Sequence, residues 1–126
     1  MTIVRLIARI LLGVIFVVFG LNGFLHFIPM PAPEGVAGQF IGAIFASGYW
    51  VVIFALQVIG GAMLLIGRFI PLALTLLGPV IVNIFCFHAF MEPSGLPLAI
   101  VVVLLWLTVF SGVHRSFAGI FAQRAS

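Results

Sequence analysis

Five polar side chains interrupt otherwise apolar stretches, and their types suit hydrogen bonding to a ligand better than catalysis. They are Asn22, His26, Gln57, Asn83 and His88. Amide and imidazole groups both donate and accept hydrogen bonds, so they could hold the carbonyl oxygens of a small apolar molecule such as a quinone. Because polar groups in apolar surroundings are costly without partners, we treat these five as a candidate ligand-binding cluster.

The same side chains also have structural interpretations. The three amides could hydrogen-bond between helices, an interaction that contributes about 0.6 kcal/mol on average in membranes. The two histidines could place their amphipathic rings at a membrane surface. On an ideal helix with 100° per residue, Asn83 and His88 point about 140° apart. We therefore expect Asn83 to face inward with Thr75 and Cys86, and His88 to lie at the interface.

Other chemistries lack the residues they need. Haem ligation would rest only on the similar depth of His26 and His88, and a zinc or di-iron site would need carboxylates nearer than Glu34 and Glu92, which lie in loops. The single cysteine, Cys86, excludes an internal disulfide and a CxxC redox pair. We expect no metal, no catalytic group and no cofactor apart from a quinone.

The elements that carry these residues are apolar enough to require a membrane. Of the 126 residues, 65% are hydrophobic and 6% are charged, whereas soluble domains average about 45–50% and about 25%. So few charged side chains cannot form the polar surface of a soluble domain. The composition predicts an all-α membrane protein whose solvent is the lipid bilayer, without a nucleic-acid partner.

Hydropathy predicts one domain, residues 1–126, built as a four-transmembrane-helix bundle. The expected spans cover residues 3–27, 49–66, 69–90 and 97–113, lengths suited to about 30 Å of hydrocarbon. Three prolines between positions 29 and 33 end the first span. The apolar stripe that follows predicts a short interfacial or re-entrant helix over residues 34–47 between spans 1 and 2. Pro79 removes one backbone donor within the third span.

The charged residues support this count of spans. With four spans, one side carries all five arginines and the other carries both glutamates; the arginines are Arg5, Arg9, Arg68, Arg115 and Arg124. The positive-inside rule then places both termini in the cytoplasm. We expect a multi-pass protein of the bacterial inner (plasma) membrane, in which Arg9 and Arg68 bind lipid headgroups.

Glycines mark the helix faces that we expect to pack together. Gly13 and Gly20 share a face with Arg9 on the first span, and Gly60 and Gly61 share one with Gln57 on the second. Small residues let helix backbones approach closely in lipid, so both faces should point into the bundle.

Three short runs resemble the DoxX family of small four-helix membrane proteins. They are Arg9-Ile-Leu-Leu-Gly13, Phe19-Gly20-Leu-Asn22-Gly23-Phe24 and Gln57-Val-Ile-Gly60-Gly61-Ala-Met-Leu-Leu-Ile-Gly67-Arg68-Phe69. That family was named for a subunit of a thiosulfate:quinone oxidoreductase, so the resemblance implies a quinone-linked role. This chain has Gly23 where a basic residue is common and Gln57 where an acid is common. The resemblance therefore does not extend to a charge-dependent redox role.

Two functions follow from these observations. The first is a non-catalytic accessory subunit, or a subunit that binds a small molecule or lipid, within a larger membrane complex such as a respiratory one. The alternative is a quinone-linked membrane oxidoreductase component whose electron-donor site lies on another subunit. In either case the partners are the bilayer and other membrane subunits or further copies of this chain.

Overall fold

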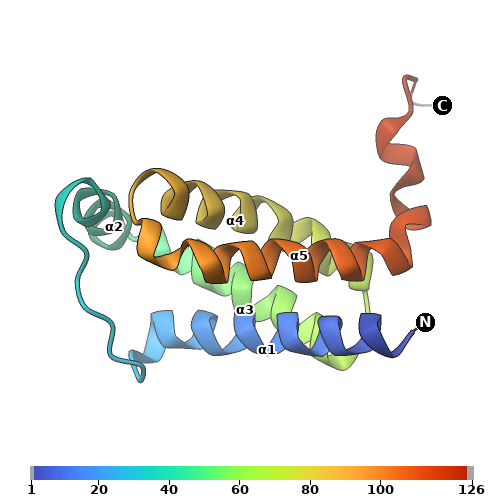
Figure 1. Ribbon diagram of the computed structural model, residues 1–126, viewed down its shortest axis with the longest axis horizontal. Helices are drawn as coiled ribbons and strands as arrows, with labels where there is room; N and C mark the ends of the chain where they lie inside the picture. The colour runs from blue at the N-terminus through green and yellow to red at the C-terminus, as the bar shows by residue number, and fades with distance from the viewer. Residues whose placement is uncertain (1, 125–126) are drawn as a thin grey trace.

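The computed structural model describes residues 2–124, and within them the regular elements are all helical. Four helices run along the molecule, namely α1 (Ile3–Leu25), α3 (Trp50–Ile66), α4 (Ile70–Phe90) and α5 (Leu96–Val113) (Figure 1). The helix α2 (Gly35–Ser47) lies across one end of them, and the 3₁₀ helices η1 (Pro93–Gly95) and η2 (His114–Phe121) flank α5. The helices begin and end within two residues of the ranges expected from hydropathy.

Local chemistry accounts for several helix ends. The Thr2 hydroxyl accepts a hydrogen bond from the Arg5 amide at 3.3 Å and caps the start of α1. The helices α2 and α3 end at Gly48 and Gly67, both with a φ of 81°. Glycine adopts this left-handed conformation without a steric penalty, so both ends occur where the sequence permits them.

The lengths and hydropathy of the helices match a membrane bundle. Three segments are each long and apolar enough to cross a membrane: α1, α4 and the stretch Pro93–Phe121 that contains α5. The helices α2 and α3 meet that criterion only as a pair, which is bent by 89°. At 1.5 Å per residue, the 17 residues of α3 extend about 26 Å, close to the thickness of a hydrocarbon core. The fold is an all-α four-helix membrane bundle with α2 across its end.

The tightest packing joins α1 to α3 through glycines. A Cβ at Gly61 would lie 2.9 Å from the Gly13 carbonyl oxygen and 2.9 Å from the Val17 amide nitrogen. A Cβ at Gly20 would lie 3.1 Å from the Gln57 Cβ. The expectation that these glycines face into the bundle is therefore confirmed. The buried aliphatic and aromatic core lies beside this contact and includes Leu12, Phe16, Leu64, Leu74, Leu77 and Val109.

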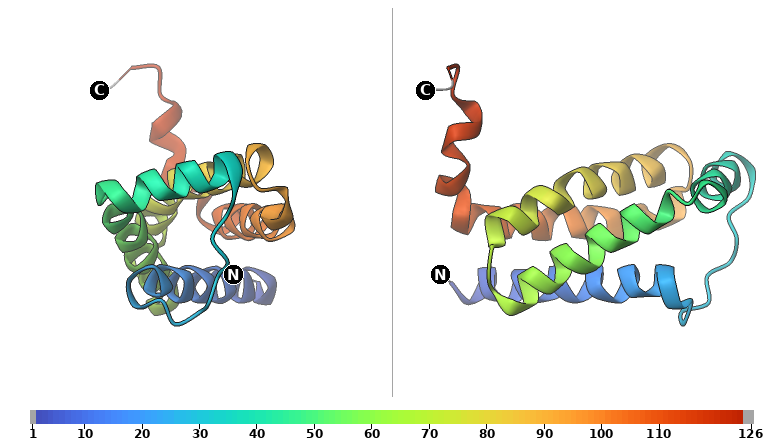
Figure 2. Two further views of the ribbon diagram at one scale, coloured as in Figure 1. Left: turned by 90° about the vertical axis from the view of Figure 1, so that its left-hand side faces the viewer. Right: turned by 180° about the vertical axis from the view of Figure 1, so that it is seen from behind.

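The two ends of the bundle carry opposite charges. Both termini, the α3–α4 turn and η2 lie at the end opposite α2 (Figures 1 and 2). All five arginines therefore belong to this end, which we call the arginine end. Glu34 precedes α2 and Glu92 precedes η1, so both acids belong to the other end, the α2 end.

Candidate functional site

Gln57 is the polar residue of the expected cluster that the fold encloses most completely. Its side chain is only 5% exposed, in the middle of α3, and its Cβ packs against the backbone of α1 at Gly20. Within residues 2–124, none of the side-chain hydrogen bonds involves its amide. The two that join different helices use Arg5 with Ser111 and Trp106 with Leu74. Gln57 therefore does not act as an interhelical hydrogen-bonding residue.

Asn22 is also buried, at 8% exposure, but it has a structural role. Its Oδ1 accepts a hydrogen bond of 2.7 Å from the Ile28 amide, and its carbonyl oxygen accepts one of 2.8 Å from the His26 amide. His26 adopts a left-handed conformation with a φ of 53°. Asn22 therefore holds the turn that ends α1, and only its amide nitrogen remains available to a ligand.

Aromatic side chains gather around this part of the α2 end. The Phe45 ring of α2 stacks on Trp50 with centroids 5.8 Å apart, and its centroid lies 6.1 Å from that of Phe54 on α3. The exposed His26 ring lies 6.4 Å from Phe45. The α2 helix thus contributes an aromatic side chain close to the elements that carry Asn22, His26 and Gln57.

The fold does not bring Asn83 to these residues. Its side chain is exposed on α4, and its Nδ2 donates a 2.8 Å hydrogen bond to the Pro79 carbonyl one turn earlier. Thr75 and Cys86 are exposed as well. The expected inward orientation of these three residues is wrong, because the opposite face of α4, with Leu74 and Leu77, fills the core.

His88 is placed separately, at the end of α4. Its Nδ1 lies 3.1 Å from the Glu92 carbonyl oxygen, and its ring packs against Gly95 and edge-on to Phe87. These contacts join α4 to η1. His88 is half-buried in this turn. Of the other expected residues, Asn22 and His26 lie where α1 ends, and Gln57 lies in the middle of α3.

The arginine end holds the second set of polar groups. The Arg9 guanidinium packs against Gly67 at the end of α3, and its Nε is buried without a hydrogen-bond partner among residues 2–124. The partial negative charge at a helix C-terminus favours a cation in this position. Arg68 is exposed in the adjacent turn, and Arg5 donates a 3.1 Å hydrogen bond from Nε to the Ser111 Oγ.

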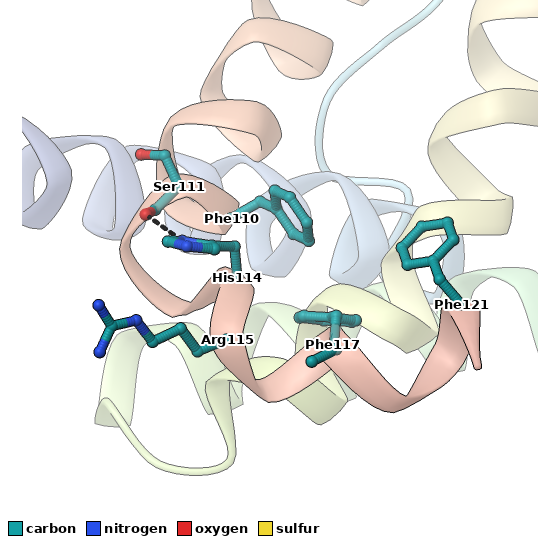
Figure 3. A pocket seen from close by; sticks show the side chains of 7 residues that line it. Phe110, Ser111, His114, Arg115, Phe117 and Phe121 are labelled. Carbon is teal, nitrogen blue, oxygen red and sulfur yellow. Dashed lines mark hydrogen bonds between the residues drawn. The ribbon is translucent and has the colours of Figure 1, made fainter.

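A hollow beside η2 is the feature that the sequence analysis missed. It measures about 620 Å³, and Phe110, Phe117, Phe121 and Arg115 are among the residues that line it (Figure 3). In the sequence these phenylalanines indicate only an apolar stripe. The hollow arises because the chain turns sharply between α5 and η2, and hydropathy does not reveal that turn.

Among residues 2–124, no three side chains of His, Cys, Asp or Glu come together.

Comparison with known proteins identifies one relationship. The DoxX family model matches residues 4–89, which is more than half of the chain. No curated protein and no solved structure matches the chain.

Proposed function

This chain belongs to the DoxX family of membrane proteins, and we propose that it is a non-catalytic subunit of a larger membrane complex, in which it binds a small amphiphilic molecule at Gln57. The observation that carries this proposal is the Gln57 amide, which belongs to a residue only 5% exposed and makes no side-chain hydrogen bond within residues 2–124. Arg9 Nε is the buried side-chain atom without a partner in these residues, so the Gln57 amide atoms are not sealed off and a ligand can reach them. A ligand carbonyl accepting from its Nε2 would satisfy this donor in its apolar surroundings.

The surroundings of Gln57 suit a ligand with an apolar body and a polar end. Phe54 lies one turn before Gln57 on α3, and the rings of Phe45 and Trp50 pack with it. Aromatic side chains with a few placed hydrogen-bonding groups are typical of small-molecule sites. A quinone fits this chemistry, since its ring can stack on aromatic side chains while its carbonyl oxygen accepts from an amide. Asn22 and His26, where α1 ends, are the candidate additional donors.

The ligand can be tested by thermal stability in detergent. We expect a soluble short-chain quinone analogue to raise the melting temperature of the wild type in a concentration-dependent manner. Gln57→Leu should reduce this shift strongly, because it removes the donor at similar volume. Asn83→Leu is the matched control, since it removes an amide that is exposed on α4, and its ligand-induced shift should equal that of the wild type.

Two results would contradict the proposal. One is a wild-type melting temperature that does not respond to saturating analogue. The other is an equal loss of the response in both variants, which would mean that ligand stabilisation does not depend on the enclosed amide.

The role as a subunit requires a separate experiment. We expect gentle detergent extraction from the native membrane to yield the chain together with other membrane subunits, identifiable by mass spectrometry. Recovery of the chain alone at native abundance would contradict this part of the proposal.

We further propose that the arginine end faces the cytoplasm of a bacterial inner membrane. The support is the positive-inside rule, because all five arginines belong to one end of the bundle and both glutamates to the other. Arg9 and Arg68 would then lie at the depth of the cytoplasmic lipid phosphates, and we propose that they contact them.

A further inference from the structure

The hollow described above lies at the bend between α5 and η2 and opens at the side of the bundle. We call it the corner. The helix η2 runs across, and not along, the direction of the four long helices (Figure 1), with Phe110 and Ser111 of α5 on one side of the bend and η2 on the other (Figure 3). In a membrane that the bundle spans, α5 descends into the hydrocarbon and η2 lies in the plane of the interface. The corner between them therefore faces lipid at headgroup depth.

The three-residue repeat of η2 sorts its side chains relative to this corner. A 3₁₀ helix has three residues per turn, so Arg115, Ala118 and Phe121 share one face. All three line the hollow, as do His114 and Phe117 of a second face, whereas Ser116 and Gly119 on the third face do not. The lining is almost entirely apolar, and its basic residues are His114 and Arg115. The Arg115 guanidinium extends away from the rings of Phe117 and Phe121 (Figure 3), so the charged group lies at the edge of the apolar surface.

The corner adjoins a second apolar groove that extends along the bundle. This groove lies between α4 and α5, measures about 380 Å³, and is lined by residues that include Gly78, Val103 and Trp106. Trp106 stacks on Phe110 of the corner, with ring centroids 5.3 Å apart and an angle of 9° between the planes. A Cβ at Gly78 would have only the Trp106 ring near it, at 3.9 Å, so the groove is open beside this glycine.

The charge around the corner selects the kind of lipid. Arg115 is at the corner, and Arg5, Arg9 and Arg68 belong to the same end of the bundle, while both glutamates belong to the other end. We propose that the corner binds one anionic phospholipid, with its phosphate at Arg115 and an acyl chain passing the Phe110–Trp106 stack into the α4–α5 groove. This site, at the arginine end, is distinct from the Gln57 site in the middle of α3, so either can fail independently.

Native mass spectrometry can measure the bound lipid directly. We would purify the full chain, add equal amounts of phosphatidylglycerol and phosphatidylcholine, and compare the lipid adducts that survive release from detergent. We expect the wild type to retain one bound lipid. Its adducts with phosphatidylglycerol should be about tenfold more abundant than those with phosphatidylcholine. Arg115→Gln should reduce this ratio to about one, because it removes the cation that favours the net negative charge of phosphatidylglycerol over the zwitterionic phosphatidylcholine. Arg124→Gln, the matched loss of charge outside the corner, should leave the ratio unchanged.

A second pair of variants tests the shape of the site. Ala118→Trp fills the corner from an exposed position and should reduce retention of both lipids at least fivefold. Ser116→Trp adds the same ring to the face of η2 that does not line the corner. This variant should retain both lipids as the wild type does.

Three outcomes would overturn the proposal. These are equal retention of the two lipids by the wild type, an equal effect of Arg115→Gln and Arg124→Gln, and a dimer of the chain that carries no lipid and is lost in Ala118→Trp. The last outcome would assign the corner to a second copy. Each variant is first checked for a monodisperse elution profile, and Arg115→Lys, which keeps the charge, should restore most of the preference if the site is correct.

Discussion

The glycine contact between α1 and α3 allows a quantitative test of the packing. In Gly61→Ala the new methyl group would lie 2.9 Å from two backbone atoms of α1, the Gly13 oxygen and the Val17 nitrogen. Favourable contacts between carbon and other heavy atoms lie near 3.5–4.0 Å. Because backbone atoms cannot rotate away, the two helices would have to separate by several tenths of an ångström along their closest contact.

The cost follows from two opposing terms. Overpacking a well-packed interior costs about 1–3 kcal/mol, and replacing glycine by alanine within a helix recovers about 1 kcal/mol. Since both obstructing atoms belong to the backbone, we expect Gly61→Ala to lower the free energy of unfolding by about 1–2 kcal/mol. Gly60→Ala should cost less, because there the methyl group meets the Leu77 side chain, which can change rotamer.

Reversible unfolding in mixed micelles, followed by tryptophan fluorescence, measures these differences. Gly42→Ala is the matched control, because nothing lies within 4 Å of a Cβ at this position of α2. It should leave the free energy of unfolding unchanged or raise it. If Gly61→Ala and Gly42→Ala had the same effect, the close approach of α1 and α3 would be refuted.

Three further expectations concern single positions. Gln57→Leu should leave the free energy of unfolding without ligand unchanged or raise it by less than about 1 kcal/mol, because the amide makes no hydrogen bond within residues 2–124 but is not sealed off; a decrease measured by the same micelle unfolding would mean that the amide is bonded within the protein. Trp106→Phe should lower that free energy by about 1 kcal/mol through loss of the 3.1 Å hydrogen bond from its Nε1 to the Leu74 carbonyl, and no change would show that this bond contributes nothing. In a chain without its native cysteine, Ser94→Cys should react with an impermeant thiol reagent in intact cells and Arg68→Cys should not, and the reverse labelling pattern would invert the proposed topology.

The helices could be predicted from the sequence because hydropathy and breakers act locally. The glycines after α2 and α3 determine where those helices end, and the prolines after α1 prevent it from continuing, whatever the helices pack against. The placement of Gly13 and Gly61 was predictable for a related reason, since small residues in lipid mark close helix contacts.

The rotation of α4 could not be predicted in the same way. Helical geometry fixes the angle between Asn83 and His88 but not which of the two faces the core. Packing decides that question, since Leu74 and Leu77 fill the centre of the bundle and leave Asn83 on the outside. The Pro79 carbonyl then gives the Asn83 amide a partner within its own helix, so an outward orientation leaves its donor satisfied.

The contrast between Gln57 and Asn83 shows why only one of two similar amides supports a site. Asn83 has a partner in its own helix, so its presence needs no ligand. Gln57 is enclosed because α1 approaches α3 at Gly20, and that approach depends on the glycine and not on the amide. An apolar side chain of similar size could occupy the same space without leaving a donor and an acceptor unbonded to the protein. Because the fold does not require the amide, we propose that its role lies in what it can bind.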